Sequence, residues 1–301
     1  MFQPPGFEPR SVKTSLGEMV YYTATDTPWI GENTASADER DTLVFLHGFG
    51  GGSSAYEWSK VYPAFAADYR IVAPDLIGWG RSNHPVRKYR IEDYVTTITE
   101  FIEETCSGPV PAIASSLTAA FTIRCAIARP DLFKCLILTT PSGLADFGES
   151  YANSFFAQIV RIPILDELFY SAGVANRNGI RLFLEQRQFA NPSRIYDEIV
   201  EAYLESAVQK NAEYAALSFV RGDLSFDLSL YVPQLTVPTA FIWGKESQFT
   251  GPEVGRRLAN LNPNAIRCFQ HLEDVGLTPQ LELPAVTIGL IRQFLQELVK
   301  E

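Results

Sequence analysis

Two adjacent serines, Ser115 and Ser116, lie between an apolar run that begins at Pro111 and a segment rich in small residues that continues to Arg124. This order predicts a buried strand, a sharp turn and a helix. An α/β fold uses such a turn to hold a serine hydroxyl above the carboxyl end of its sheet. A serine hydroxyl becomes a good nucleophile only when a base takes its proton, and that base is normally a histidine oriented by a carboxylate. Catalysis by this turn therefore requires a histidine and an acid elsewhere in the chain.

The sizes of the neighbouring residues favour Ser116 over Ser115 as the nucleophile. The residue at the apex of such a turn has a strained backbone and holds strand and helix close together, so the positions two before and two after it should be small. Around Ser116 these positions are Ala114 and Thr118. Around Ser115 they would be an isoleucine and a leucine, which would clash. We therefore expect Ser116 to occupy the apex.

Composition excludes several classes of protein. The chain has 301 residues, of which 46% are hydrophobic and 20% charged, and this is enough apolar surface for a large core. Its net charge of −10 argues against a nucleic-acid partner. We find no signal-peptide pattern and no apolar run near the roughly 18 residues of a membrane span. The four cysteines form no C-x-x-C pair and there are only three histidines, so we expect reduced thiols, a cytoplasmic location, no metal and no cofactor.

The order of the predicted elements indicates an α/β fold. Short apolar runs that predict strands alternate with helical segments, which is typical of a mostly parallel sheet with helices on both faces. Between residues 144 and 233 the alternation gives way to helical segments, with Asn178 and Ser193 as predicted helix caps. We therefore expect a core formed by 1–143 and 234–301, with 144–233 inserted as a helical lid. The predicted strands are 11–16 and 18–25 as a hairpin, 42–46, 70–74, 135–140, 239–243 and 265–269, and the main predicted helices are 91–104, 153–170, 178–189, 193–209, 212–221 and 284–300.

Three motifs in sequence order resemble the α/β-hydrolase superfamily. The run His47-Gly-Phe-Gly-Gly follows one predicted strand, Asp75-Leu-Ile-Gly-Trp-Gly-Arg-Ser follows the next, and the turn at Ser116 follows a third. Each motif alone is weak, but their order and separations are specific, and the similarity covers nearly the whole chain. The resemblance implies an α/β-hydrolase sheet in which Ser116 is the nucleophile.

The resemblance also implies an oxyanion hole formed by two backbone N–H groups. The positions that match the family's donors are Phe49, which follows Gly48, and Leu117. The family's elbow usually has glycines where this chain has Ala114 and Thr118. Because Thr118 is β-branched, it adds bulk where the helix must approach the strand.

The resemblance fails at the base and at the acid. The family's histidine precedes an apolar-Glu-x-Pro run, and this chain has Leu277 at that position. A leucine side chain accepts no proton at any pH. The family's acid follows a Trp-Gly step, and here Ser247 occupies its place, with Glu246 as the neighbouring carboxylate. Adjacent residues at the end of a strand point apart, so Glu246 is a poor substitute.

The remaining histidines offer weak alternatives. His271 lies six residues before Leu277, and only a rearranged loop would bring it to Ser116. His47 belongs to the oxyanion loop, where the resemblance implies a structural role, and His84 lies in a predicted loop. Asp146 lies where some relatives keep their acid, but an acid without a base has no catalytic role.

Three functional hypotheses remain. The first is a pseudo-hydrolase that binds a small apolar molecule under the lid. The second is a carboxylic-ester or thioester hydrolase that uses Ser116, and the third is a lyase or isomerase that needs only the oxyanion hole. A dehalogenase is excluded because its nucleophile is a carboxylate, whereas position 116 has a hydroxyl. The apolar and aromatic run from Phe155 to Tyr170 predicts a helix that roofs the pocket or, alternatively, a docking surface for a protein partner.

Overall fold

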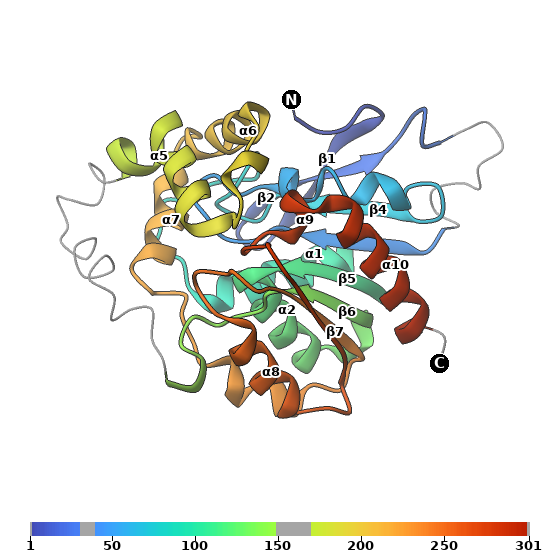
Figure 1. Ribbon diagram of the computed structural model, residues 1–301. Helices are drawn as coiled ribbons and strands as arrows, with labels where there is room; N and C mark the ends of the chain where they lie inside the picture. Colours follow the sequence, from blue (N-terminus) through green and yellow to red (C-terminus); the bar gives the residue numbers. More distant parts are fainter. Residues whose placement is uncertain (1, 31–39, 149–169, 300–301) are drawn as a thin grey trace.

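A computed structural model describes residues 2–30, 40–148 and 170–299, which surround one eight-stranded sheet (Figure 1). The strand order is β1-β2-β4-β3-β5-β6-β7-β8. The β1–β2 hairpin is antiparallel and joins β4 antiparallel, whereas the strands from β4 to β8 are parallel. The strands are β1 (Phe7–Thr14), β2 (Gly17–Ala24), β3 (Thr42–Leu46), β4 (Arg70–Pro74), β5 (Val110–Ser115), β6 (Phe133–Thr139), β7 (Thr239–Gly244) and β8 (Ile266–Leu272). The predicted α/β fold with a mostly parallel sheet is confirmed.

Helices cover both faces of the sheet because consecutive strand residues point in opposite directions. In β3, Val44 packs in the core with α1 and α2, whereas its neighbour Phe45 packs in the core with α10. Figure 1 shows α10 on one side of the sheet and α1, α2 and α8 on the other. These helices are α1 (Ile91–Thr105), α2 (Ser116–Ala128), α8 (Pro252–Asn260) and α10 (Pro284–Val299), and α10 is preceded by the single turn α9 (Pro279–Glu282).

The hairpin begins four residues earlier than the sequence predicts. In β1, Phe7 pairs with Ala24 and Thr14 pairs with Gly17. As an edge strand, β1 exposes most of its side chains. A strand of this kind lacks the alternation of apolar and polar residues on which a sequence-based boundary depends.

The connection between β6 and β7 contains the predicted helical segment, which we call the insertion (residues 170–232 of the described chain). Figure 1 shows its helices α5, α6 and α7 gathered at one end of the molecule. Two predicted caps are wrong. Asn176, not Asn178, caps α5 by accepting a hydrogen bond from the Gly179 N–H, and α6 begins after Tyr196 rather than at Ser193. The predicted helix 153–170 lies outside the described residues except for its last residue. The insertion contains α5 (Arg177–Phe183), α6 (Asp197–Ala207), α7 (Ala212–Val220) and two π-helical turns, Tyr170–Val174 and Leu184–Gln188.

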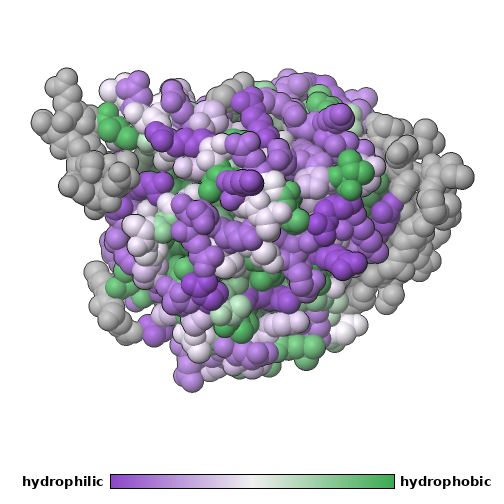
Figure 2. Space-filling model, turned by 180° about the vertical axis from the view of Figure 1, so that it is seen from behind, coloured by the Kyte–Doolittle hydropathy of each residue, from purple (hydrophilic) through white to green (hydrophobic). Residues whose placement is uncertain are grey.

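The described surface carries isolated hydrophobic side chains. Figure 2, which views the molecule from behind, shows a largely hydrophilic face with small scattered hydrophobic groups. The exposed large hydrophobic residues include Val86 on the core and Leu182 on the insertion. Among the helices of the described chain, none has both the length and the apolar character needed to cross a bilayer.

Candidate active site

The parallel strands bring the predicted site residues to one edge of the sheet. His47 directly follows β3, Ser116 directly follows β5, and Leu277 lies in the loop after β8. Leu46 is in register with Ala114, so the loop after β3 begins beside the turn at Ser116. The carboxyl ends of parallel strands meet at the same edge, which is where α/β folds build their sites.

Ser116 occupies a strained backbone position at the junction of β5 and α2. Its φ angle is +57°, which lies in the left-handed region that residues other than glycine rarely adopt. Leu117 is the second residue of α2, so its N–H is among the helix donors that have no partner within the helix. The sharp turn therefore forms with Thr118, which is fully buried, in place of the usual glycine.

The loop after β3 is fixed by a buried carboxylate that the sequence reasoning missed. The Gly48 N–H donates to Glu57 Oε2 at 2.8 Å, and the Tyr203 hydroxyl donates to Glu57 Oε1 at 3.0 Å. Glu57 is fully buried, and this burial raises the pKa of its carboxyl. Glu57 therefore links the predicted oxyanion loop to helix α6 of the insertion.

Gly48 lies directly between this carboxylate and the serine. A Cβ atom built on Gly48 would lie 3.3 Å from Glu57 Oε2 and 3.4 Å from Ser116 Cβ. Glu57 Oε2 therefore lies no farther from Ser116 Cβ than the sum of these two distances. On the same side, Gln280 Nε2 donates to Ser115 Oγ at 3.2 Å. A carboxylate and an amide thus lie near the two serines.

His47 is held as a structural residue. Its Nε2 accepts a hydrogen bond from the Leu76 N–H at 3.0 Å, and its Nδ1 lies 2.7 Å from the Gly48 carbonyl oxygen. These partners assign the proton to Nδ1, and complete burial lowers the pKa of the imidazole to about 4. Because its basic nitrogen already holds a backbone N–H, His47 has no lone pair to offer Ser116.

The other two histidines lie away from the serine. His271 is on β8, three strands from β5, which corresponds to about 14 Å across the sheet. Its side chain is 44% exposed, and its Nε2 lies 3.7 Å from Glu273. His84 lies in the loop after β4, where its carbonyl accepts a hydrogen bond from Asn211. All three histidines belong to the described chain, and none is in position to take the proton of Ser116.

Leu277 is packed into the protein at the position where a base is expected. Its side chain is 2% exposed, and its N–H donates to the Gln188 carbonyl of the insertion at 2.7 Å. The Ser247 hydroxyl is buried and has no partner among the described residues. Glu246 uses its carboxylate to accept a hydrogen bond from the Val275 N–H at 3.0 Å, so it fixes the loop before Leu277 and orients no base.

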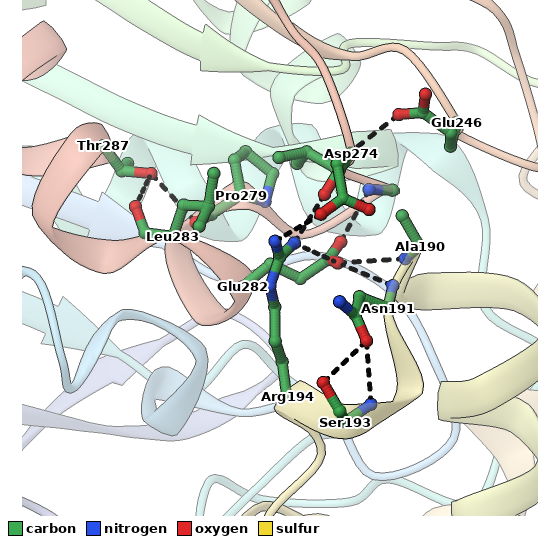
Figure 3. Close-up of polar contacts among 12 residues, drawn as sticks. Ala190, Asn191, Ser193, Arg194, Glu246, Asp274, Pro279, Glu282, Leu283 and Thr287 are labelled. Carbon is green, nitrogen blue, oxygen red and sulfur yellow. Dashed lines mark hydrogen bonds and ion pairs between the residues drawn. The ribbon is translucent and has the colours of Figure 1, made fainter.

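The loop before Leu277 is clamped to the insertion by Glu282 (Figure 3). The Glu282 carboxylate accepts hydrogen bonds from the Gly276 N–H at 2.6 Å and from the Ala190 N–H at 2.9 Å. Arg194 approaches the same carboxylate at 3.4 Å and pairs with Asp274 at 2.6 Å. Glu282 thus holds together two segments that are far apart in sequence, and it does so without a catalytic histidine.

Asp146 organises a different loop. Its carboxylate accepts hydrogen bonds from the Ser142 hydroxyl at 2.6 Å and from the Leu228 N–H at 2.9 Å, and it also lies 3.2 Å from the Gly143 N. Burial raises the pKa of this carboxyl. The predicted alternative acid therefore joins the segment after β6 to the chain that leads into β7.

A cavity of about 570 Å³ lies between the insertion and the carboxyl edge of the sheet. Gly51 lines it from the loop after β3, and Gln248 and Phe249 line it from the segment after β7. Most of the remaining wall is apolar and belongs to the insertion, and the volume is typical of small-molecule sites. The other described lining residues are Tyr170, Gly173, Val174, Gly179, Ile180, Leu182, Phe183, Gln186, Arg187, Ala216, Leu217, Phe219 and Val220.

Comparisons with known proteins agree with this fold. Residues 43–289 match the family model described as "Alpha/beta hydrolase family". The chain is 24% identical over 265 residues to the uncharacterized hydrolase YugF of Bacillus subtilis, covering 87% of this chain and 90% of that protein. It is 25% identical over 255 residues to the Karrikin insensitive 2 receptor IA of Petunia hybrida, covering 83% and 88%. The solved structure of a serine hydrolase involved in carbazole degradation, the CarC enzyme, is similar with a TM-score of 0.75 at 18% identity, covering 97% and 99%.

The strained turn leads to a stability prediction. Ser116→Gly should be about 1 kcal/mol more stable than Ser116→Ala, because glycine relieves the left-handed strain that alanine retains. Ser115 has a φ angle of −119° and provides the matched control. There the glycine variant should be less stable than the alanine variant by roughly 0.5–1 kcal/mol. Urea unfolding measures both differences. If the alanine variant were more stable than the glycine variant at position 116 as well as at position 115, the strain at Ser116 would be contradicted.

Burial of His47 leads to a pH prediction. The folded pKa of His47 is about 4, which is below its unfolded value of 6.5. The contribution of neutral His47 to the free energy of unfolding is therefore fully present above pH 6.5 and is lost as the pH falls toward 4. His47→Gln should therefore destabilise the protein more at pH 7.5 than at pH 5.0. The difference in free energy of unfolding between wild type and variant should be about 2 kcal/mol smaller at pH 5.0. Urea unfolding at both pH values tests this. A difference in free energy of unfolding that does not change with pH would show that the fold does not lower the pKa of His47.

Proposed function

Because the chain belongs to the alpha/beta hydrolase family, we propose that it is a pseudo-hydrolase that binds a small apolar molecule. The observation that carries this proposal is the packing of Leu277, the residue that the sequence predicts at the position of the base, which is buried and bonded through its backbone to the insertion. Ser116, Phe49 and Leu117 are not among the described residues that line the cavity, whereas Gly51 of the same loop after β3 is. In this proposal they supply polar groups next to the apolar site, and residues 144–233 serve as its lid.

The chemistry of the site supports binding over turnover. Acyl transfer from a serine requires a base to remove the hydroxyl proton and an acid to protonate the leaving group. Leucine does neither, and His47 is committed to the Leu76 N–H. An oxyanion hole and a binding site without the full triad still leave roughly 10³–10⁴-fold acceleration over water. The expected chemical activity is therefore small but not zero.

The cavity supports an apolar ligand. Its wall is built largely from aliphatic and aromatic side chains such as Val174, Phe183 and Leu217. Burial of apolar ligand surface contributes about 25 cal/mol per Å², so a ligand of drug-like size gains most of its affinity from such a wall. One of the relatives is named a receptor, which is consistent with a binding role for this fold.

A second candidate function is hydrolysis of a carboxylic ester or thioester through Ser116. The observation that favours it is the retained strain at Ser116, whose φ angle of +57° is the conformation that a nucleophile on this turn requires. Strain of this kind is often associated with functional sites. The two candidates predict opposite outcomes in one assay.

We expect the purified protein to hydrolyse p-nitrophenyl acetate slowly and to react slowly with a fluorophosphonate probe, because no base activates Ser116. Ser116→Ala should leave the ester hydrolysis nearly unchanged. Intact-protein mass spectrometry measures the labelling and absorbance measures the turnover. Stoichiometric labelling at Ser116 together with fast turnover that Ser116→Ala abolishes would overturn the pseudo-hydrolase proposal and establish the second candidate.

Restoring the missing groups tests whether their loss explains the low activity. Leu277→His combined with Ser247→Asp should raise ester hydrolysis by about 10²-fold, which is the lower range for a positioned base. Leu277→His alone should give a smaller increase, and Ser116→Ala in the restored background should remove the gain. A folded double variant without any gain would show that the shape of the turn, rather than the missing base, limits the chemistry.

A further inference from the structure

Arg187 is the only cation among the described residues that line the cavity, and no carboxylate lines it there. It lies in the π-helical turn Leu184–Gln188, beside Gln186, and both residues are exposed and line the cavity. Gln248 lines the same cavity from the segment after β7. The other polar side chain of the described lining, that of Tyr170, donates its hydroxyl to the Ala207 carbonyl. Arg187 thus supplies the positive charge of the wall, and Gln186 and Gln248 supply amides.

The other described arginines at residues 177–194 of the insertion have carboxylate partners. Arg177 pairs with Asp197 at 3.0 Å, Arg181 pairs with Asp197 at 2.7 Å, and Arg194 pairs with Asp274 at 2.6 Å. Within the described chain, Arg187 has no acidic side chain within ion-pair distance. Unlike these three arginines, Arg187 lines the cavity. Its guanidinium is available to an anion from outside the chain.

This arrangement matches the chemistry of an amphiphile. The guanidinium presents planar N–H donors that fit carboxylate, sulfonate and phosphate oxygens in pairs. Next to it lie apolar side chains, among them Leu182, Phe183 and Val220. A purely apolar ligand would leave the charge unused, whereas a purely polar anion would leave the apolar wall uncovered.

We propose that the ligand of this cavity is an amphiphilic anion, whose apolar body fills the space beneath the insertion and whose oxyanion pairs with Arg187. This inference rests on the proposed function, since it names the class of molecule that the cavity binds. Arg187 is exposed, so the contribution of the pair to affinity is that of a screened ion pair rather than a buried one.

Two fluorescent probes separate the charge from the apolar body. 8-Anilino-1-naphthalenesulfonate carries a sulfonate, and N-phenyl-1-naphthylamine has the same aromatic skeleton without it. Fluorescence titration at low salt should show that Arg187→Gln weakens the sulfonate about three- to fivefold and leaves the neutral probe unchanged. Arg187→Lys should restore part of the loss. Arg181→Gln, which alters a paired arginine on the same insertion, should change neither probe.

Two further measurements fix the location and the mechanism. Leu217→Trp fills the cavity and should weaken both probes, with circular dichroism confirming that each variant is folded. Raising the salt concentration to 0.5 M should weaken the sulfonate with the wild-type protein but not with Arg187→Gln, because salt screens the ion pair.

The outcomes distinguish the two levels of the hypothesis. Equal sulfonate affinity in wild type and Arg187→Gln, with the neutral probe sensitive to Leu217→Trp, would overturn the inference and leave the proposed function standing. A neutral probe that fails to bind, or that ignores Leu217→Trp, would overturn the proposed function and with it the inference.

Discussion

The hydrogen bond from the Gly48 N–H to the buried Glu57 carboxylate is the contact on which the geometry of the site depends. A carboxylate without solvent is costly unless several donors satisfy it. Here the donors come from the loop after β3 and, through Tyr203, from helix α6 of the insertion. Glu57 therefore fixes the loop after β3 and the insertion relative to one another. A Cβ atom at Gly48 would lie 3.3 Å from Glu57 Oε2 and 3.4 Å from Ser116 Cβ, so a side chain at this position would be tightly packed against both residues.

A second set of contacts keeps the loop after β8 in place without the help of a histidine. Glu282 binds backbone N–H groups on both sides of the gap between this loop and the insertion, and Glu246 binds the Val275 N–H from the end of β7. These are contacts between side chains and the main chain, and none involves the side chain at position 277. The position of this loop therefore does not depend on which side chain stands at position 277.

The parts of the structure that depend on local pattern were predictable from the sequence. The bounds of β3 and β4 follow from short apolar runs, and Ser116 follows from the sizes of the residues two positions away. Glu57 was not predictable because its partner Tyr203 is 146 residues away, and a lone glutamate beside a tryptophan carries no local signal. The caps of α5 and α6 were misplaced because several asparagine and serine residues compete within a few positions, and tertiary contacts decide among them.

The hydrogen bond from the Leu277 N–H to the Gln188 carbonyl also bears on how such a protein can arise. A bond between two main chains is made by any residue other than proline, so a change of side chain at position 277 leaves the insertion docked. A protein with a histidine there could exchange it for leucine in a single step, losing proton transfer while retaining its shape. The docking of the insertion at position 277 therefore tolerates a change of side chain that would alter the chemistry of the neighbouring loop.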